Sequence, residues 1–176
     1  MIRDMIKDSI RKSINESVLI PKVLYRGIEG KYSSTYQQDI TWVSTDEEYA
    51  KSYTKGNGEV LKFTFTSPPN ILDLGFRTAD TEVQFSDIVD RLQQRLSEYF
   101  RNGKITKEKA FQIMDILDEM NFSGHKKVYM WMQAKPLIEI YKMMQVDAIL
   151  QREGNPHSGN VITFGVINKL KLRRIL

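Results

Sequence analysis

The sequence predicts an α+β fold, in which a helical block separates two β-rich segments. Residues 23–65 contain short apolar runs broken by turn residues, a pattern typical of strands. Residues 81–144 carry apolar side chains at three- and four-residue steps, a pattern typical of amphipathic helices. Residues 146–166 return to β-rich runs on either side of a turn-rich loop. We therefore expect strands at both ends of the domain and helices between them.

Composition sets the limits of this domain. The chain has 176 residues, of which 41% are hydrophobic and 27% charged, as expected for one globular domain with its own core. Cysteine is absent, which excludes disulfides, thiol nucleophiles and thiolate metal sites and fits a reducing compartment. The apolar runs are too short to span a bilayer, and the N-terminus lacks the apolar core of a signal peptide. We expect a soluble cytoplasmic protein without a membrane span.

Residues 1–20 are predicted to form an N-terminal amphipathic helix ahead of a single domain over residues 21–176. One stripe of this helix is apolar and comprises Ile2, Met5, Ile6, Ile10, Ile14 and Val18. Such a helix either docks on the core or binds a partner, and the pattern does not separate these two roles. The net charge of +4, with its basic excess near both termini, indicates either a solvated surface or attraction to nucleic acid or an acidic protein.

The first β-rich segment is expected to hold extended runs and one short helix. The extended runs cover residues 24–27, 41–44, 59–65 and 71–74. Either Thr45 or Asp46 can cap a short helix after the second run. The inner face of this helix offers Tyr49, Ala50 and Tyr53.

Four helices and a hairpin are expected in the remainder of the chain. The helical stripes begin at Val83, after Thr106, at Val128 and at Pro136. The hairpin has strands over residues 146–150 and 161–166, joined through a loop over residues 154–159.

Four short motifs in the β-rich segments carry the residues that point to a chemistry. In chain order they are Arg26-Gly27, Trp42 with Ser44-Thr45, Tyr53, and Gln151-Arg152-Glu153. Their order resembles the ADP-ribosyltransferase family, in the class whose signature is Arg, then Ser-Thr, then a Glu preceded two positions earlier by Gln or Glu. The resemblance covers most of residues 23–170.

The resemblance implies a fold, a reaction and a set of site residues. The fold is an ADP-ribosyltransferase-like split β-sandwich with a central helical insertion, and the reaction is mono-ADP-ribosylation, in which ADP-ribose moves from NAD to a protein or nucleic-acid acceptor. Carried over from the family, the catalytic residues are Arg26, Ser44 and Glu153, and the NAD-binding residues are Arg26, Gly27, Trp42, Ser44, Thr45 and Tyr53. Residues 154–159 adjoin the acid, so Gln151, Asn155 and His157 are expected to recognise the acceptor. Enzymes of this kind include phage and bacterial effectors and toxins.

The chemistry suits these residue types. Cleavage of the nicotinamide–ribose bond builds positive charge on the anomeric carbon, which the Glu153 carboxylate would stabilise. The planar guanidinium of Arg26 would hold pyrophosphate or ribose oxygens in a way that lysine does not imitate. Gly27 would let the nicotinamide amide approach the backbone closely. A hydrogen bond from Ser44 would orient the glutamate.

Alternatives to this assignment stay open. In the register of the poly(ADP-ribose) polymerase branch, Asn160 takes the place of the acid, but that branch has histidine where Arg26 stands, which favours Glu153. An NAD glycohydrolase would use the same site with water as the acceptor. A non-catalytic module of this fold would instead attach to a larger assembly, such as a virion, through residues 1–20. The sequence has no dinucleotide-binding fingerprint and no phosphate-binding loop, so other nucleotide sites fit it less well. His125 and His157 lack the spacing of metal ligands, so we expect NAD as substrate and no metal.

Overall fold

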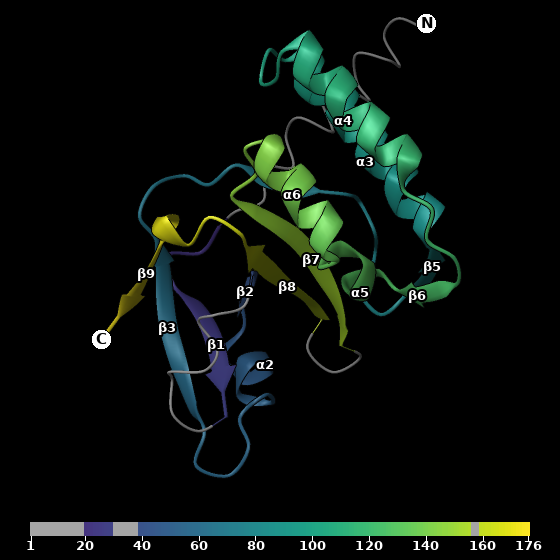
Figure 1. The fold of residues 1–176 in the computed structure, drawn as a ribbon. Helices are drawn as coiled ribbons and strands as arrows, with labels where there is room; N and C mark the ends of the chain where they lie inside the picture. The colour runs from purple at the N-terminus through teal and green to yellow at the C-terminus, as the bar shows by residue number, and fades with distance from the viewer. Residues whose placement is uncertain (1–19, 30–38, 156–158) are drawn as a thin grey trace, which may run out of the picture.

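The structure, a computed structural model, describes residues 20–29, 39–155 and 159–176. These residues form a mixed sheet of seven strands, a small sheet of two strands and five α-helices, which confirms the predicted α+β class (Figure 1). The predicted amphipathic helix over residues 1–20 lies outside the described residues, apart from Ile20.

The large sheet is built around a central hairpin. Its strands are β1 (Leu24–Ile28), β2 (Thr41–Ser44), β3 (Glu59–Phe65), β4 (Ile71–Asp73), β7 (Ala148–Asn155), β8 (Gly159–Val166) and β9 (Leu172–Ile175). Their order across the sheet is β4-β7-β8-β2-β1-β3-β9. Only β4 and β7 are parallel among these neighbours. The β7–β8 hairpin and β2 therefore lie at the centre of the sheet.

The sheet bends where β1 meets β2. The two strands share a single residue pair, Tyr25 with Ser44, whereas β1 pairs with β3 along its full length. One apolar core contains residues from both sides of this joint. In this core the rings of Phe65 in β3 and Phe164 in β8 meet edge to face, with their centroids 6.1 Å apart. The two strands are not neighbours in the sheet. Where the resemblance implies a split β-sandwich, the described residues form one seven-stranded sheet whose two halves share this core.

The helices cover the other face of the central strands. They are α3 (Phe85–Arg101), α4 (Lys107–Glu119), α5 (Val128–Met132) and α6 (Lys135–Met143), and Figure 1 shows them grouped on one side of β7 and β8. As predicted, α4 begins after Thr106 and Pro136 lies in the first turn of α6. Thr106 caps α4 by accepting a hydrogen bond from the backbone N–H of Lys109. The helices share one continuous apolar core with Ile149 and Leu72 of the sheet.

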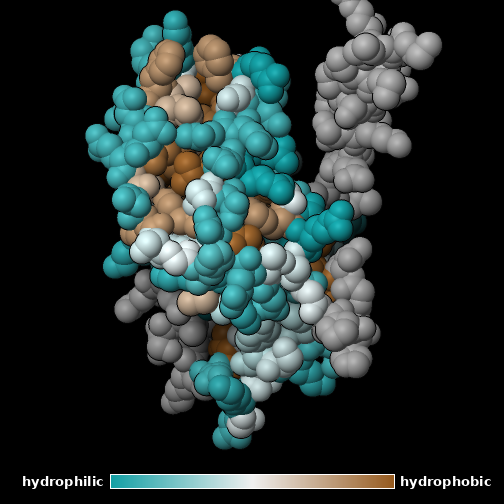
Figure 2. Space-filling view, turned by 90° about the vertical axis from the view of Figure 1, so that its right-hand side faces the viewer, coloured by the Kyte–Doolittle hydropathy of each residue, from teal (hydrophilic) through white to brown (hydrophobic). Residues whose placement is uncertain are grey.

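The outer surface of this helical layer carries a strip of apolar side chains. Figure 2 shows these side chains gathered in the upper part of the face, with hydrophilic residues on both sides. Phe100 of α3 and Phe111 of α4 are both exposed. The apolar stripe expected after Thr106 comprised Phe111, Met114 and Leu117, of which Leu117 is buried as expected, whereas Phe111 is exposed and Ile113 is buried instead.

Two expectations on strand boundaries are wrong. Val83 was assigned to the first helix, but it lies in β5 (Glu82–Gln84), which pairs with β6 (His125–Lys127) to form the small sheet. The loop expected over residues 154–159 is also too long, because β7 runs to Asn155 and β8 begins at Gly159. In both places a short, mostly polar stretch of chain pairs with a neighbouring strand through backbone hydrogen bonds. Such pairing does not appear in the pattern of apolar residues along the sequence.

A polar cluster at Asp147 joins the ends of the sheet. Its carboxylate, almost fully buried, accepts hydrogen bonds from the backbone N–H of Asn70 at 2.7 Å, the amide of Asn168 at 2.8 Å and the ammonium of Lys171 at 2.7 Å. Burial alone would raise the pKa of Asp147, but these donors outweigh it and hold the pKa below its ordinary value. The cluster connects the start of β4 with the start of β7 and the 3-10 turn (Lys169–Lys171) before β9.

Replacing Asp147 should therefore weaken the fold in a pH-dependent way. Asp147→Asn should lower the free energy of unfolding by about 1–3 kcal/mol at neutral pH, because Lys171 loses its charged acceptor. Since folding lowers the pKa of Asp147, its contribution is present above the ordinary value of 3.8 and is lost as the pH falls through the lower pKa of the folded state. Urea unfolding between about pH 7 and pH 3 measures this. The variant should lose less stability on acidification than the wild type.

Asp115→Asn, at an exposed position on α4, is the matched control and should follow the wild-type pH dependence. Equal acid sensitivity of Asp147→Asn and the wild type would contradict the role given to Asp147.

Candidate functional site

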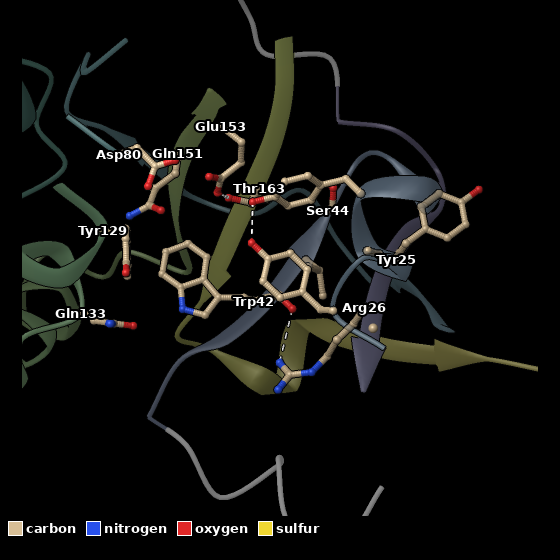
Figure 3. A pocket seen from close by; sticks show the side chains of 15 residues that line it. Tyr25, Arg26, Trp42, Ser44, Asp80, Tyr129, Gln133, Gln151, Glu153 and Thr163 are labelled. Atoms are coloured by element: carbon tan, nitrogen blue, oxygen red, sulfur yellow. Dashed lines mark hydrogen bonds between the residues drawn. The ribbon is translucent and has the colours of Figure 1, made fainter. Parts of the chain in front are cut away.

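A pocket of about 410 Å³ opens beside the joint between β1 and β2 (Figure 3). This volume lies within the range of about 300–1,000 Å³ that is usual for small-molecule sites. Its walls come from both halves of the sheet, from α2 (Glu47–Lys51) and, on the side of the helical layer, from α5. The lining residues are Tyr25, Arg26, Gly27, Trp42, Val43, Ser44, Tyr49, Ala50, Tyr53, Asp80, Tyr129, Gln133, Gln151, Glu153 and Thr163.

The floor of the pocket is a row of four residues at one level of the sheet, which we call the polar row: Tyr25, Ser44, Thr163 and Gln151. The register pairs Tyr25 with Ser44, Ser44 with Thr163, and Thr163 with Gln151. Three of the four, all except Tyr25, are buried polar side chains. Motifs that are more than a hundred residues apart in the chain are thus brought together through backbone pairing.

Glu153 stands above this row on β7, two residues beyond Gln151 and on the same face of the strand. Its carboxylate Oε1 accepts a hydrogen bond of 2.6 Å from the hydroxyl of Thr163. Ser44 was expected to orient this glutamate. Ser44 Oγ instead accepts from the backbone N–H of Asp46 at 3.0 Å, in the turn that leads into α2. In the sheet, the residue that bonds Glu153 is Thr163, which the sequence motifs did not include.

Helix α2 brings two tyrosines to the pocket. Asp46 caps the helix, as one of the two predicted caps, by accepting from the backbone N–H of Tyr49 at 2.6 Å. The hydroxyls of Tyr49 and Tyr53 are hydrogen-bonded at 2.7 Å. Burial, the bond with Tyr53 and the negative charge of Glu153 together raise the pKa of Tyr49, which is therefore a neutral phenol near neutral pH. Tyr53, which was expected on the inner face, follows the helix and is 56% exposed at the rim.

Arg26 and Glu153 lie at opposite ends of the pocket in Figure 3. The Arg26 guanidinium crosses from β1 to β2, where its Nη1 donates to the backbone carbonyl of Trp42 at 3.3 Å. This bond spans the region in which the backbones of β1 and β2 no longer pair. The indole of Trp42 lies between the two ends of the pocket.

Arg152, between Gln151 and Glu153 on β7, holds in place the chain segment that leads to Asp80 at the pocket. Arg152 forms a two-pronged ion pair with Asp73, at 2.9 and 2.6 Å, and its carbonyl accepts from the backbone N–H of Ala79 at 2.7 Å. Although burial opposes it, the pairing with Arg152 holds the pKa of Asp73 below its ordinary value. These bonds fix the segment over residues 74–80 along the edge of β7, and it ends with Asp80 at the pocket.

Gln151 closes the floor toward the helices. It is 4% exposed, and its Nε2 lies 3.3 Å from the sulfur of Met132 in α5. Its side chain is thus held between β7 and the helical layer. Acceptor recognition by Gln151 would therefore proceed from a buried position.

Of the remaining expected site residues, only Thr45 has a described side chain, and it does not line the pocket. Thr45 joins β2 to β8, because its hydroxyl donates to the carbonyl of Ile162 at 3.1 Å. Asn155 and Asn160 lie in the hairpin ladder, opposite Gly159 and Gly154, and the described part of the structure does not include their side chains. His157 lies outside the described residues. Whether Glu153 or Asn160 occupies the position of the family's catalytic acid thus stays a prediction.

Comparison with known proteins adds no relative. No protein-family model, curated protein or solved structure matches this chain. Within residues 20–29, 39–155 and 159–176, no helix is both long and apolar enough to cross a membrane. The same residues contain no group of three or more histidine or carboxylate side chains arranged to hold a metal ion.

Gly27 is required by the close approach of α2 and β1. A Cβ atom at this position would lie 1.9 Å from the carbonyl oxygen of Ala50. The glycine was expected to make room for a ligand, whereas the atoms that occupy this space belong to α2. The absence of a side chain at Gly27 therefore sets the position of the helix that carries Tyr49.

Gly27→Ala should displace α2 and lower the free energy of unfolding by about 1–3 kcal/mol, because the new methyl group meets backbone atoms. Backbone amide NMR shifts of α2 and urea unfolding measure the two effects. Gly103→Ala is the control, since its Cβ would meet open space and only its φ of +68° is strained. The control should leave the α2 shifts unchanged, and unchanged α2 shifts in Gly27→Ala would disprove the steric role.

Proposed function

We propose that this protein is a mono-ADP-ribosyltransferase that moves ADP-ribose from NAD to a macromolecular acceptor. The observation that supports this function is the meeting of Arg26, Ser44, Gln151 and Glu153 in one pocket. The order of the short sequence motifs singles out the same four residues. A chance set of residues from three distant segments would not be expected to share one cavity.

The fold supports the same proposal. A split β-sandwich would explain why the sheet divides at the β1–β2 joint and why its halves enclose an apolar core. The family's helical insertion would correspond to α3 through α6, which lie between the two β-rich segments in the chain. In such a fold NAD binds beside the split, and the pocket of this protein opens at that place.

The Arg26 end of the pocket suits the pyrophosphate of NAD, and the Glu153 end suits the ribose that is attached to nicotinamide. The Arg26 guanidinium offers a planar, permanently charged donor for pyrophosphate oxygens. Glu153 offers a carboxylate to the ribose hydroxyls and to the positive charge that develops on the anomeric carbon. Trp42 between them, with Tyr49 and Tyr53, offers aromatic surface to the flat nicotinamide ring.

The reaction proceeds by exchange at one carbon. The bond between the anomeric carbon and the nicotinamide nitrogen breaks, and its electron pair leaves with nicotinamide, which neutralises the pyridinium charge. A nucleophilic atom of the acceptor then bonds the anomeric carbon and releases its proton to a base or to water. Glu153 stabilises the oxocarbenium-like state between these events. No metal ion or further cofactor is needed for this balance.

The labelled product identifies the reaction. The purified protein is incubated with NAD labelled in the adenylate part and with a cell lysate, and protein, nucleic acid and small molecules are then separated. Label on protein or nucleic acid supports transfer. Label found only in free ADP-ribose, with or without lysate, would show an NAD glycohydrolase instead. Unchanged NAD with measurable binding would indicate a non-catalytic module.

Glu153→Gln should reduce NAD cleavage at least about a hundredfold, because the positive charge of the transition state loses its carboxylate. Binding of NAD, measured by calorimetry, should change little. Glu119→Gln, at an exposed position on α4, is the matched control and should keep wild-type turnover. If Glu153→Gln keeps wild-type turnover and Asn160→Ala loses it, the register with Glu153 at the acid's position is wrong and the one with Asn160 there is right.

Arg26→Lys should act on binding more than on turnover. Loss of the planar guanidinium should raise the Kd for NAD by about tenfold or more, since hydrogen bonds to charged groups are among the strong ones. Cleavage of bound NAD at saturation should fall much less. Calorimetry and saturation kinetics separate the two quantities, and Arg101→Lys at the exposed end of α3 is the control. An unchanged Kd in Arg26→Lys would refute the phosphate-binding role.

A further inference from the structure

We propose that Thr163 is the positioning residue of the Glu153 carboxylate. The inference rests on the proposed function, in which Glu153 is the reactive carboxylate. The hydroxyl of Thr163 donates to Glu153 Oε1 at 2.6 Å, and Thr163 itself is only 5% exposed. A bond of this length is typical of a hydroxyl that donates to a charged carboxylate.

The place of Thr163 in the sheet makes it a rigid donor. It lies on β8 between β2 and β7, and its backbone is held by pairing with Ser44 on one side and Gln151 on the other. Threonine is branched at Cβ, so its side chain has few rotamers in a strand. Strand pairing therefore directs the Thr163 hydroxyl toward Glu153, which lies on β7 two residues beyond Gln151, the residue paired with Thr163.

The carboxylate needs such a partner. Glu153 is half-buried, two residues before the end of β7, and a free glutamate side chain would distribute over several rotamers. The bond from Thr163 selects the rotamer that points into the pocket. It uses one of the roughly four acceptor sites of the carboxylate, so other sites stay able to accept from a ligand hydroxyl.

Neighbouring hydroxyls serve other purposes. Ser44 Oγ accepts from the backbone of Asp46, and the hydroxyl of Thr45 is bonded to the backbone of β8. The hydroxyls of Tyr49 and Tyr53 bond each other, and Tyr49 also interacts with Glu153. Of these residues, Thr163 alone reaches Glu153 from the rigid sheet rather than from α2.

Kinetics of two variants test the role. Thr163→Val keeps the shape of the side chain and removes the donor, and Thr163→Ser keeps the donor. Thr163→Val should lower kcat for NAD cleavage about 10- to 100-fold with little change in KM, because the bond acts on the reacting group. Thr163→Ser should restore most of kcat. Thr64→Val, on β3 outside the pocket, is the matched control.

Wild-type kcat in Thr163→Val would overturn the proposal. A loss that Thr163→Ser does not restore, accompanied by a lower midpoint of thermal unfolding, would also overturn it, because the threonine would then serve packing alone.

A second measurement does not depend on NAD. In the proton NMR spectrum of the wild type, the Thr163 hydroxyl proton should appear at low field and exchange slowly, as expected for a short bond to a carboxylate. It should vanish in Thr163→Val and move upfield in Glu153→Gln. Absence of this signal in the wild type would overturn the proposal. If the signal is present and the wild type neither binds nor cleaves NAD, the proposed function fails while the bond between Thr163 and Glu153 stands.

Discussion

The single backbone pair between Tyr25 and Ser44 is the constraint on which both the core and the pocket depend. A longer ladder between β1 and β2 would hold the two halves of the sheet in one gently twisted surface. With one pair, the sheet bends there, and its concave side buries Phe65 against Phe164. On its opposite side the same bend leaves the space that the pocket occupies. Arg26 crosses the gap and bonds the carbonyl of Trp42, so a polar side chain replaces the missing ladder.

The β7–β8 hairpin supplies the side of this space that carries Glu153, through the simple alternation of side chains along a strand. In β7, Ala148 and Leu150 face the core between the halves of the sheet, whereas Gln151 and Glu153 face the pocket. Because side chains alternate with a period of two, a slip of one residue would bury Glu153 in the apolar core. The ion pair of Arg152 with Asp73 at the edge of the hairpin opposes such a slip. The position of the carboxylate is thus a property of strand register.

Features that depend on neighbouring residues could be predicted from the sequence, and features that depend on register could not. The cap of α2 at Asp46, the cap of α4 at Thr106 and the place of Pro136 in α6 follow from local hydrogen bonding and backbone geometry. The contact of Thr163 with Glu153 depends on which residue of β8 lies opposite Gln151, and no local pattern encodes that.

The misplaced boundaries have the same origin. β5 and β6 are short polar strands whose pairing joins residues more than forty positions apart, and an apolar pattern does not report such pairing. The edge strand β9, with Arg173 and Arg174 exposed, has only Leu172 buried. The basic end of the chain was therefore interpreted as charge alone. Asp80 reached the pocket through the bonds of its segment to β7, which again connect distant residues.

The polar row is the strongest physical reason to regard this pocket as a binding site. Ser44, Thr163 and Gln151 are buried side by side on the three central strands, where apolar residues would pack without hydrogen-bond requirements. Burial of polar groups costs free energy unless each finds a partner, and apolar replacements of similar shape are often neutral or stabilising. Ser44 has a structural partner in the turn into α2. Thr163, by contrast, bonds the pocket carboxylate Glu153, and among the described residues the Gln151 side chain contacts only a sulfur, a weak acceptor, so the fold alone gives no reason for the polarity of these two. A polar ligand that bonds these groups does give one, because such a site is useful only when its polar side chains are already held in place by the sheet.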